Sequence, residues 1–185
     1  MTNTTPTTLD QPVVTFTAET LVKAAELATA AYRPVWVGPS GEQSSGESVA
    51  SHLEATIALL NSDGWVRTFT YTGAWPAGSG TSLTVDDSMS VKDMLKTLLQ
   101  WVRDDIGTDP RRPLAIALRH VGEGDHGDAD TTAIASTVLD LVIRAHTGSD
   151  TAHAAPWSER LARTHEEIVA LLSAGAQFAR SYGPA

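Results

Sequence analysis

The sequence THEEIVALLSAGAQFARSY at residues 164–182 decides the expected fold of the chain. Thr164 and Glu167 form a T-x-x-E capping box, which satisfies two free backbone N–H groups at the start of a helix. Apolar residues then follow at helical spacing, at positions 168, 171, 172, 178 and 179. Gly183 and Pro184 end the segment. We therefore predict an amphipathic helix over His165–Tyr182 that buries one face against other helices.

Five further segments upstream have the same helical periodicity. They are residues 18–32, 49–61, 91–106, 113–121 and 131–146. Thr17 and Asp130 are the predicted N-caps of the first and the last of these segments. Residues 113–121 also alternate as a strand would, but the proline at their start favours a helix. His52 and Glu54 lie off the apolar stripe of their segment, so we expect both to be solvent-exposed.

Residues 65–72 break this periodicity, because they alternate with a period of two and are rich in aromatic and β-branched residues. After a turn-rich stretch, residues 81–85 form a plausible return strand. The predicted fold is therefore mainly α, a compact bundle of about six helices with one peripheral β-hairpin, and α+β is the alternative. We expect residues 1–12 to be a flexible tail and residues 13–185 to be a single helical domain.

Composition excludes several function classes. The 185 residues are 42% hydrophobic and 19% charged, which is enough to bury a core. The absence of cysteine excludes disulfides, iron–sulfur clusters, Cys-ligated zinc and thiol nucleophiles. A net charge of −9, with only a small arginine cluster, argues against nucleic-acid binding. No apolar run is long enough for a membrane span and no signal peptide is recognisable, so we expect a cytoplasmic monomer or small homo-oligomer.

Two short motifs carry a resemblance to a known family. The first is DGW at residues 63–65, and the second is WSERLART at residues 157–164, directly before the last predicted helix. Together they resemble the DUF6197-type family of uncharacterised domains from actinobacteria and their phages. The resemblance covers roughly residues 49–179. It implies a mainly helical fold and no assigned activity.

The match to that family is incomplete at two places. Trp157, Arg163 and Thr164 have the family spacing, whereas Ser158 and Glu159 stand where the family tends to have Asn and Asp. A family segment containing Cys and Gly would fall at residues 113–118, and this chain lacks both residues there. Any role that depends on that segment is therefore in doubt.

The second motif also has a physical interpretation. Thr164 caps the helix, Trp157 packs back over its first turn, and Arg163 reaches Ser158, Glu159 or a carbonyl group to hold the loop. A ligand-binding role for Trp157, Glu159 and Arg163 is the alternative, and Trp157 and Arg163 are candidate partner-binding residues.

Two further tryptophans lie in predicted loops rich in Gly and Pro, Trp36 and Trp75. Both are candidate partner-binding residues, because exposed aromatic side chains often anchor protein interfaces. Packing onto the helical layer is the alternative for each of them.

The densest polar segment is HVGEGDHGDAD at residues 120–130. Imidazole and carboxylate groups together suit zinc, manganese or iron. The candidate ligands are His120, Glu123, Asp125, His126 and Asp128. Their spacing matches no established metal loop, and an exposed acidic turn before a helix is the favoured interpretation. The formal G-x-G-x-x-G at residues 122–127 lacks the βαβ context that dinucleotide binding needs.

Two functional hypotheses follow from these patterns. The favoured one is a small accessory protein that acts by protein–protein interaction with an unknown protein partner, associated with a mobile element or phage. It needs no cofactor and no catalytic residues. The alternative is a small metal-binding or metal-dependent hydrolytic domain that holds a divalent metal in the loop at residues 120–130.

Overall fold

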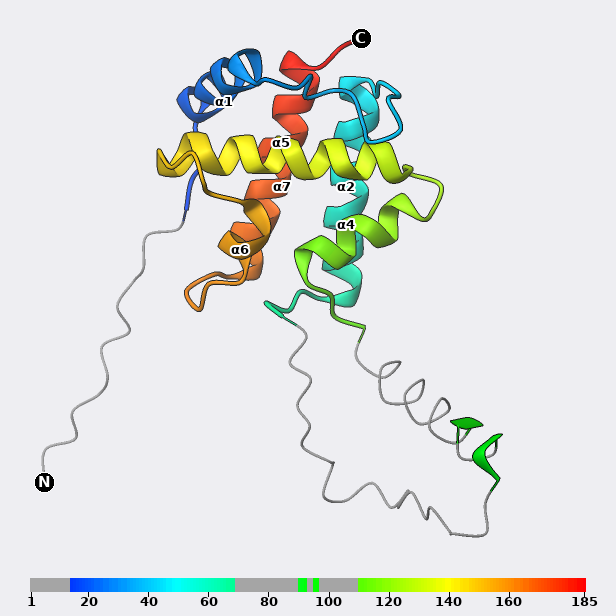
Figure 1. The fold of residues 1–185 in the computed structure, drawn as a ribbon. Helices are drawn as coiled ribbons and strands as arrows, with labels where there is room; N and C mark the ends of the chain where they lie inside the picture. Colours follow the sequence, from blue (N-terminus) through cyan, green and yellow to red (C-terminus); the bar gives the residue numbers. More distant parts are fainter. Residues whose placement is uncertain (1–13, 69–89, 93–94, 97–109) are drawn as a thin grey trace, which may run out of the picture.

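The computed structural model of the chain describes residues 14–68, 90–92, 95–96 and 110–185 (Figure 1). The predicted tail at residues 1–12, the predicted return strand at residues 81–85 and Trp75 lie outside the described residues.

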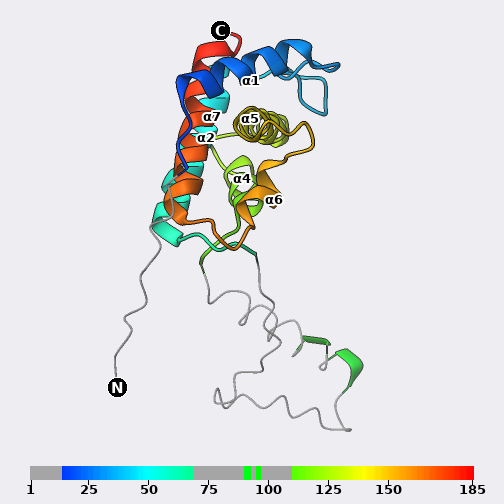
Figure 2. The same ribbon diagram turned by 90° about the vertical axis from the view of Figure 1, so that its left-hand side faces the viewer.

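Two long helices, α2 (Gly46–Asp63) and α7 (His165–Tyr182), lie side by side and form one layer (Figure 2). They run antiparallel. At one end the N–H of Gly46 donates to the carbonyl of Pro184 at 2.8 Å, and at the other end His165 Nε2 lies 3.0 Å from Asn61 Oδ1. The capping box of α7 forms as predicted, because Thr164 Oγ1 accepts from the N–H of Glu167 and the Glu167 carboxylate accepts from the N–H of Thr164.

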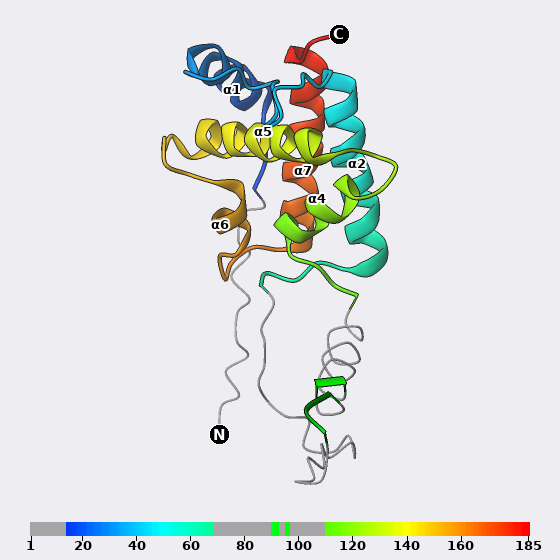
Figure 3. The same ribbon diagram turned by 45° about the vertical axis from the view of Figure 1, so that its right-hand side comes forward.

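The second layer covers one side of this pair (Figures 1 and 2) and, within the described part of the chain, contains four helices. They are α1 (Ala18–Ala30), α4 (Leu114–Gly122), α5 (Ala129–Thr147) and α6 (Ala154–Ser158). α5 crosses over both long helices, with α1 on one side of it and α4 and α6 on the other (Figures 1 and 3). α4 contacts α2, α5 and α6. The mainly helical prediction is confirmed.

The two layers meet over side chains that are almost completely buried. The largest are Phe178, Leu53, Leu60, Leu114, Ile134, Leu139, Ile143, Ile168, Leu171 and Leu172. Gly175 allows this close packing. A Cβ at that position would lie 2.6 Å from Leu139 Cδ2 and 3.1 Å from Leu53 Cδ1. Side chains of α5 and α2 therefore fill the space that a larger residue on α7 would need.

Two helix starts differ from the sequence prediction. α2 begins at Gly46, three residues early, because Ser45 acts as its N-cap and accepts from the N–H of Ser48 at 3.1 Å. α5 is capped by Asp128, which accepts from the N–H of Thr131 at 2.7 Å. The prediction of Asp130 as the cap was wrong, since its carboxylate binds a loop far away in the sequence.

The predicted peripheral hairpin is not supported. Of its first strand only residues 65–68 are described, and Trp65 makes an isolated parallel bridge to Arg112. The N–H of Val66 donates to the carbonyl of Arg112 at 3.2 Å, and the N–H of Arg112 donates to the carbonyl of Gly64 at 3.1 Å. The backbone at Gly64 and Val66 thus pairs with Arg112, in the segment that leads into α4.

Three other segments can be compared with the helices that the sequence predicts. Residues 114–122 are helical, so the strand interpretation of this segment was wrong. The short helix α6 begins at Ala154, in a stretch where no helix was predicted. Within the predicted helix at residues 91–106, the described residues 91, 92, 95 and 96 are helical and the others lie outside the described part. Across the described ranges, no helix combines the length and the apolar character that crossing a membrane requires.

Candidate functional site

A cleft of about 390 Å³ opens between α4, α5 and α6, and we call it the α4–α5–α6 cleft. Its walls are mostly apolar. They are formed by Leu114 and Leu118 of α4, Leu139 of α5 and the segment from Ala154 to Pro156 of α6. The leucines of the wall belong to the buried core, whereas Ala115, His153 and Pro156 are exposed, so the cleft is an open depression at the edge of the packed layers.

The polar part of this cleft is centred on an aspartate–histidine pair. Asp140 Oδ2 lies 2.7 Å from His153 Nδ1, and Asp140 Oδ1 accepts from the N–H of Ala154 at 2.8 Å. Asp140 therefore connects α5 to the first residue of α6 and fixes the imidazole beside the cleft. The side chain of His153 is 52% exposed, so a molecule in the cleft could reach it.

Sequence reasoning missed this pair, although both residues carry weak signals. Asp140 is a carboxylate within the otherwise apolar run at residues 138–143, and His153 directly precedes the short helix α6. The pairing becomes visible only when the turn after α5 brings α6 back along it.

The second family motif forms a packed unit at the start of α7. Trp157 is only 3% exposed, and the guanidinium carbon of Arg163 lies 4.1 Å from the centroid of its ring. Arg163 Nη1 also donates to Glu167 Oε1 at 3.1 Å. The interpretation as a lock before the helix agrees with this geometry. Arg163 reaches Glu167, however, and not Ser158 or Glu159.

Of the two loop tryptophans, only Trp36 is described. Its ring stacks on Phe178 of α7, with centroids 6.1 Å apart and planes inclined by 14°. The same loop is anchored through Ser40, whose N–H donates to Asp130 Oδ1 at 2.8 Å and whose hydroxyl donates to Asp130 Oδ2. Trp36 is consequently half-buried, and the loop that carries it is fixed on α5 and α7.

The five candidate metal ligands do not gather at one point. Asp128 caps α5, and Glu123 forms an ion pair with Arg119 of α4 at 3.7 Å. The carbonyl oxygen of His126 contacts the ring of His52. His120, Asp125 and His126 are all exposed. Among the described residues, no group of three or more His, Asp or Glu side chains is arranged to hold a metal ion.

His52, expected to be exposed, is completely buried on α2. Its Nδ1 lies 3.3 Å from the carbonyl oxygen of His126, and Gly127 packs directly against the ring. Burial lowers the pKa of His52, and the backbone carbonyl groups of His126 and Leu118 offset this only in part. The prediction of a solvated His52 was wrong, because the turn before α5 folds back and covers it.

Acidification is therefore expected to destabilise the fold. The pKa of His52 is lower in the folded state than in the unfolded chain, where it is about 6.5. The stabilisation is present above that value and is lost as the pH falls through the folded pKa. Urea unfolding between about pH 7.5 and 5 should show a declining free energy of unfolding, and H52Q should flatten the decline.

A matched control separates this effect from other groups. H120Q removes an exposed histidine in place of the buried one and is the matched control variant. The pKa of His146 is lowered by burial and by the charge of Arg163, so H146Q measures the contribution of a second histidine. A profile of H52Q that coincides with that of the wild type would contradict the assignment to His52.

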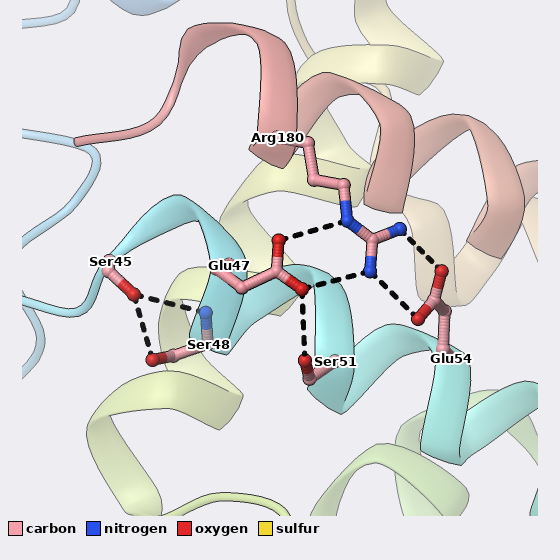
Figure 4. A network of polar contacts seen from close by, with 6 residues as sticks. All are labelled: Ser45, Glu47, Ser48, Ser51, Glu54 and Arg180. Atoms are coloured by element: carbon pink, nitrogen blue, oxygen red, sulfur yellow. Dashed lines mark hydrogen bonds and ion pairs between the residues drawn. The ribbon is translucent and has the colours of Figure 1, made fainter. Parts of the chain in front are cut away.

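A second ionic cluster joins the two long helices on their exposed surface (Figure 4). The guanidinium of Arg180 lies between Glu47 and Glu54 and donates to Glu47 at 3.0 Å and to Glu54 at 2.9 Å. These hydrogen bonds lower the pKa of both carboxyl groups and raise that of Arg180. Because all three side chains are well exposed, we interpret the cluster as a weak clamp between α2 and α7 and not as a site.

Comparison with known proteins identifies one family. A family model described as "Family of unknown function (DUF6197)" matches residues 44–178. No curated protein and no solved structure matches the chain. The matched region begins just before α2 and ends at Phe178, so it contains every residue of the α4–α5–α6 cleft. α1 and most of the loop that follows it precede the matched region.

Proposed function

The chain belongs to the DUF6197 family, whose function is unknown, and we propose that it is a binding protein that takes a small apolar molecule into the α4–α5–α6 cleft. One observation carries this proposal. An apolar cleft between α4, α5 and α6 has one hydrogen-bonded polar pair, Asp140 and His153, in its lining.

The chemistry of the cleft is typical of small-molecule sites. Such sites are concave, mostly apolar and largely pre-formed, and they contain a few polar groups that orient the ligand. The volume of about 390 Å³ is larger than that of an engineered protein cavity of about 150 Å³ that binds benzene. A molecule with one substituted ring therefore fits, and the affinity expected for so few atoms is weak.

Methyl-labelled NMR with benzene as the probe tests the proposal. Millimolar benzene is expected to shift the methyl resonances of Leu114, Leu118 and Leu139, which line the cleft, and not those of Leu53 and Leu171. Wild-type spectra in which no cleft methyl responds would overturn the proposal.

A pair of matched variants locates the binding. Ala115 lines the cleft from an exposed position on α4, so A115W should fill the cleft and abolish the shifts. Ala58 is an exposed residue of α2 outside the cleft, and A58W should leave the shifts unchanged. Equal shifts in A115W and the wild type would place the bound probe elsewhere.

We propose protein–protein interaction as a second candidate function, supported by the surface of the loop after α1. Tyr32 is fully exposed, and Val37 is 38% exposed beside Trp36. Large apolar side chains held on a fixed loop are suited to anchor a protein partner. Trp75, Trp157 and Arg163 stay additional proposed contacts, although Trp157 is covered in this structure.

The double variant Y32S/V37S tests this second function. A protein captured by the wild type is purified and titrated against both forms, and the double variant is expected to bind at least about tenfold more weakly. L161A, which removes an exposed leucine from another loop, is the control. Equal affinity for the wild type and Y32S/V37S would rule out this surface.

A further inference from the structure

We infer that the α4–α5–α6 cleft selects an apolar molecule that donates a hydrogen bond, through a hydroxyl or an N–H group, to Nε2 of His153. This inference rests on the proposed small-molecule function and specifies the class of ligand. It follows from the way in which Asp140 fixes the ring proton of the imidazole.

The position of that proton is determined by the two oxygens of Asp140. Oδ1 accepts from the backbone N–H of Ala154 at 2.8 Å, and Oδ2 lies 2.7 Å from His153 Nδ1. An ionised carboxylate can only accept hydrogen bonds. Nδ1 must therefore be the donor in the contact with Asp140, and it carries the ring hydrogen.

A neutral imidazole with its hydrogen on Nδ1 has a free lone pair on Nε2. No described residue makes a hydrogen bond to Nε2 of His153. Ser136, which brings a hydroxyl group to the lining, already donates to the carbonyl of Thr132 at 3.0 Å. In the neutral ring, Nε2 of His153, a residue that lines the cleft, is thus an acceptor without a partner among the described residues.

This arrangement discriminates between ligands of similar shape. A molecule with a hydroxyl or N–H group satisfies Nε2, whereas an acceptor-only molecule places an oxygen lone pair against the nitrogen lone pair. Phenol and anisole form a suitable probe pair, because both have an aromatic ring and an oxygen but only phenol can donate. From the usual net strength of one hydrogen bond, phenol should bind about three- to tenfold more tightly than anisole.

The tautomer itself can be measured without any ligand. At about pH 8, above the ordinary histidine pKa, long-range ¹H–¹⁵N spectra distinguish the ring nitrogen that carries hydrogen from the one that does not. In the wild type, Nδ1 of His153 is expected to be protonated and Nε2 to be free. A hydrogen on Nε2 in the wild type would overturn the inference.

The variant D140N gives the sharpest test, because it should reverse the tautomer. The N–H of Ala154 still needs an acceptor, so the amide oxygen takes the place of Oδ1 and the NH₂ group faces Nδ1. Nδ1 must then accept, and the ring hydrogen moves to Nε2. The preference for phenol is expected to vanish or to change into a preference for anisole. An unchanged preference for phenol in D140N would refute the role of Asp140.

H153F serves as a second variant in case D140N disturbs the start of α6. It keeps an aromatic ring at the edge of the cleft and removes the acceptor, so phenol and anisole should bind with equal affinity. If both probes shift the cleft methyl resonances equally in the wild type, the small-molecule function stands and the inference fails. If neither probe shifts them, the proposed function fails as well.

Discussion

Replacing Trp157 with alanine is expected to cost about 3–5 kcal/mol of the free energy of unfolding, the range typical for truncating a buried aromatic residue. Trp157 is 3% exposed and its ring lies 6.1 Å from that of Phe16, so the truncation leaves a cavity between α6 and the segment before α1. It also removes the ring beneath Arg163, whose guanidinium carbon lies 4.1 Å from the ring centroid. Urea unfolding followed by far-UV circular dichroism measures the loss.

The neighbouring leucine provides a control within the same loop. Leu161 is 85% exposed, so L161A should change the free energy of unfolding by no more than about 0.5 kcal/mol. R163A removes the partner and keeps the tryptophan, and it leaves Glu167 buried without its counter-charge. We therefore expect a loss for R163A between those for L161A and W157A. A loss of less than about 1 kcal/mol for W157A would mean that the motif is not a packed unit.

The sequence could predict this lock because its parts are close together in the chain. Trp157, Arg163 and Thr164 lie within eight residues, and a capping box fixes the helix that follows them. The partner of Arg163 was missed because Glu167 was assigned only to the cap. In the structure the Glu167 carboxylate has both roles. Its Oε2 accepts from the N–H of Thr164 in the cap, and its Oε1 accepts from Arg163.

The same local reasoning could not predict contacts between segments that are far apart in the sequence. Asp130 binds Ser40, which lies 90 residues away, so a good N-cap candidate became a loop anchor. His52 is buried by a turn 74 residues further on. Local periodicity reports which face of a helix is apolar, but it does not report that a polar residue beside that face will be covered by another segment.

The predicted hairpin is not supported, and the reason is related. Alternation at residues 65–72 correctly indicated extended backbone at Trp65, where a bridge does form. It could not identify the segment that pairs with Trp65, because pairing depends on which segment the fold brings alongside. Arg112, just before α4, takes that place. The Asp140–His153 pair of the cleft is hidden from sequence analysis in the same way, although its members are only 13 residues apart.

Truncation of Phe178 is the second large effect that we expect. F178A should cost about 3–5 kcal/mol, because the side chain is completely buried between the two layers. It should also loosen the loop after α1, since the ring of Trp36 stacks on Phe178 at 6.1 Å. Native-state hydrogen exchange is expected to show faster exchange at Gly38 and Ser44, whose N–H groups donate within that loop.

A double-mutant cycle with W36A separates the two contributions. If the rings stack as observed, the two substitutions should be non-additive by about 0.5–1.5 kcal/mol, the range measured for aromatic pairs. Y182A is the control. Tyr182 also contacts Phe178, with centroids 5.2 Å apart, but it is 42% exposed, so its own loss should be smaller. Strict additivity of W36A and F178A would show that the loop is held by Asp130 and not by this stack.

The same cycle bears on how this chain extends the family fold. Phe178 is the last residue of the matched region, and Trp36 precedes its first residue. Their contact therefore attaches an N-terminal segment outside the family match to the last helix of the family domain. A coupling energy near the upper end of the range, together with faster exchange in F178A, would make the segment part of the folding unit. Unchanged exchange at Gly38 and Ser44 would mean that contacts with α5, such as Ser40 with Asp130 and Ser44 with Thr131, hold the loop without the aromatic stack.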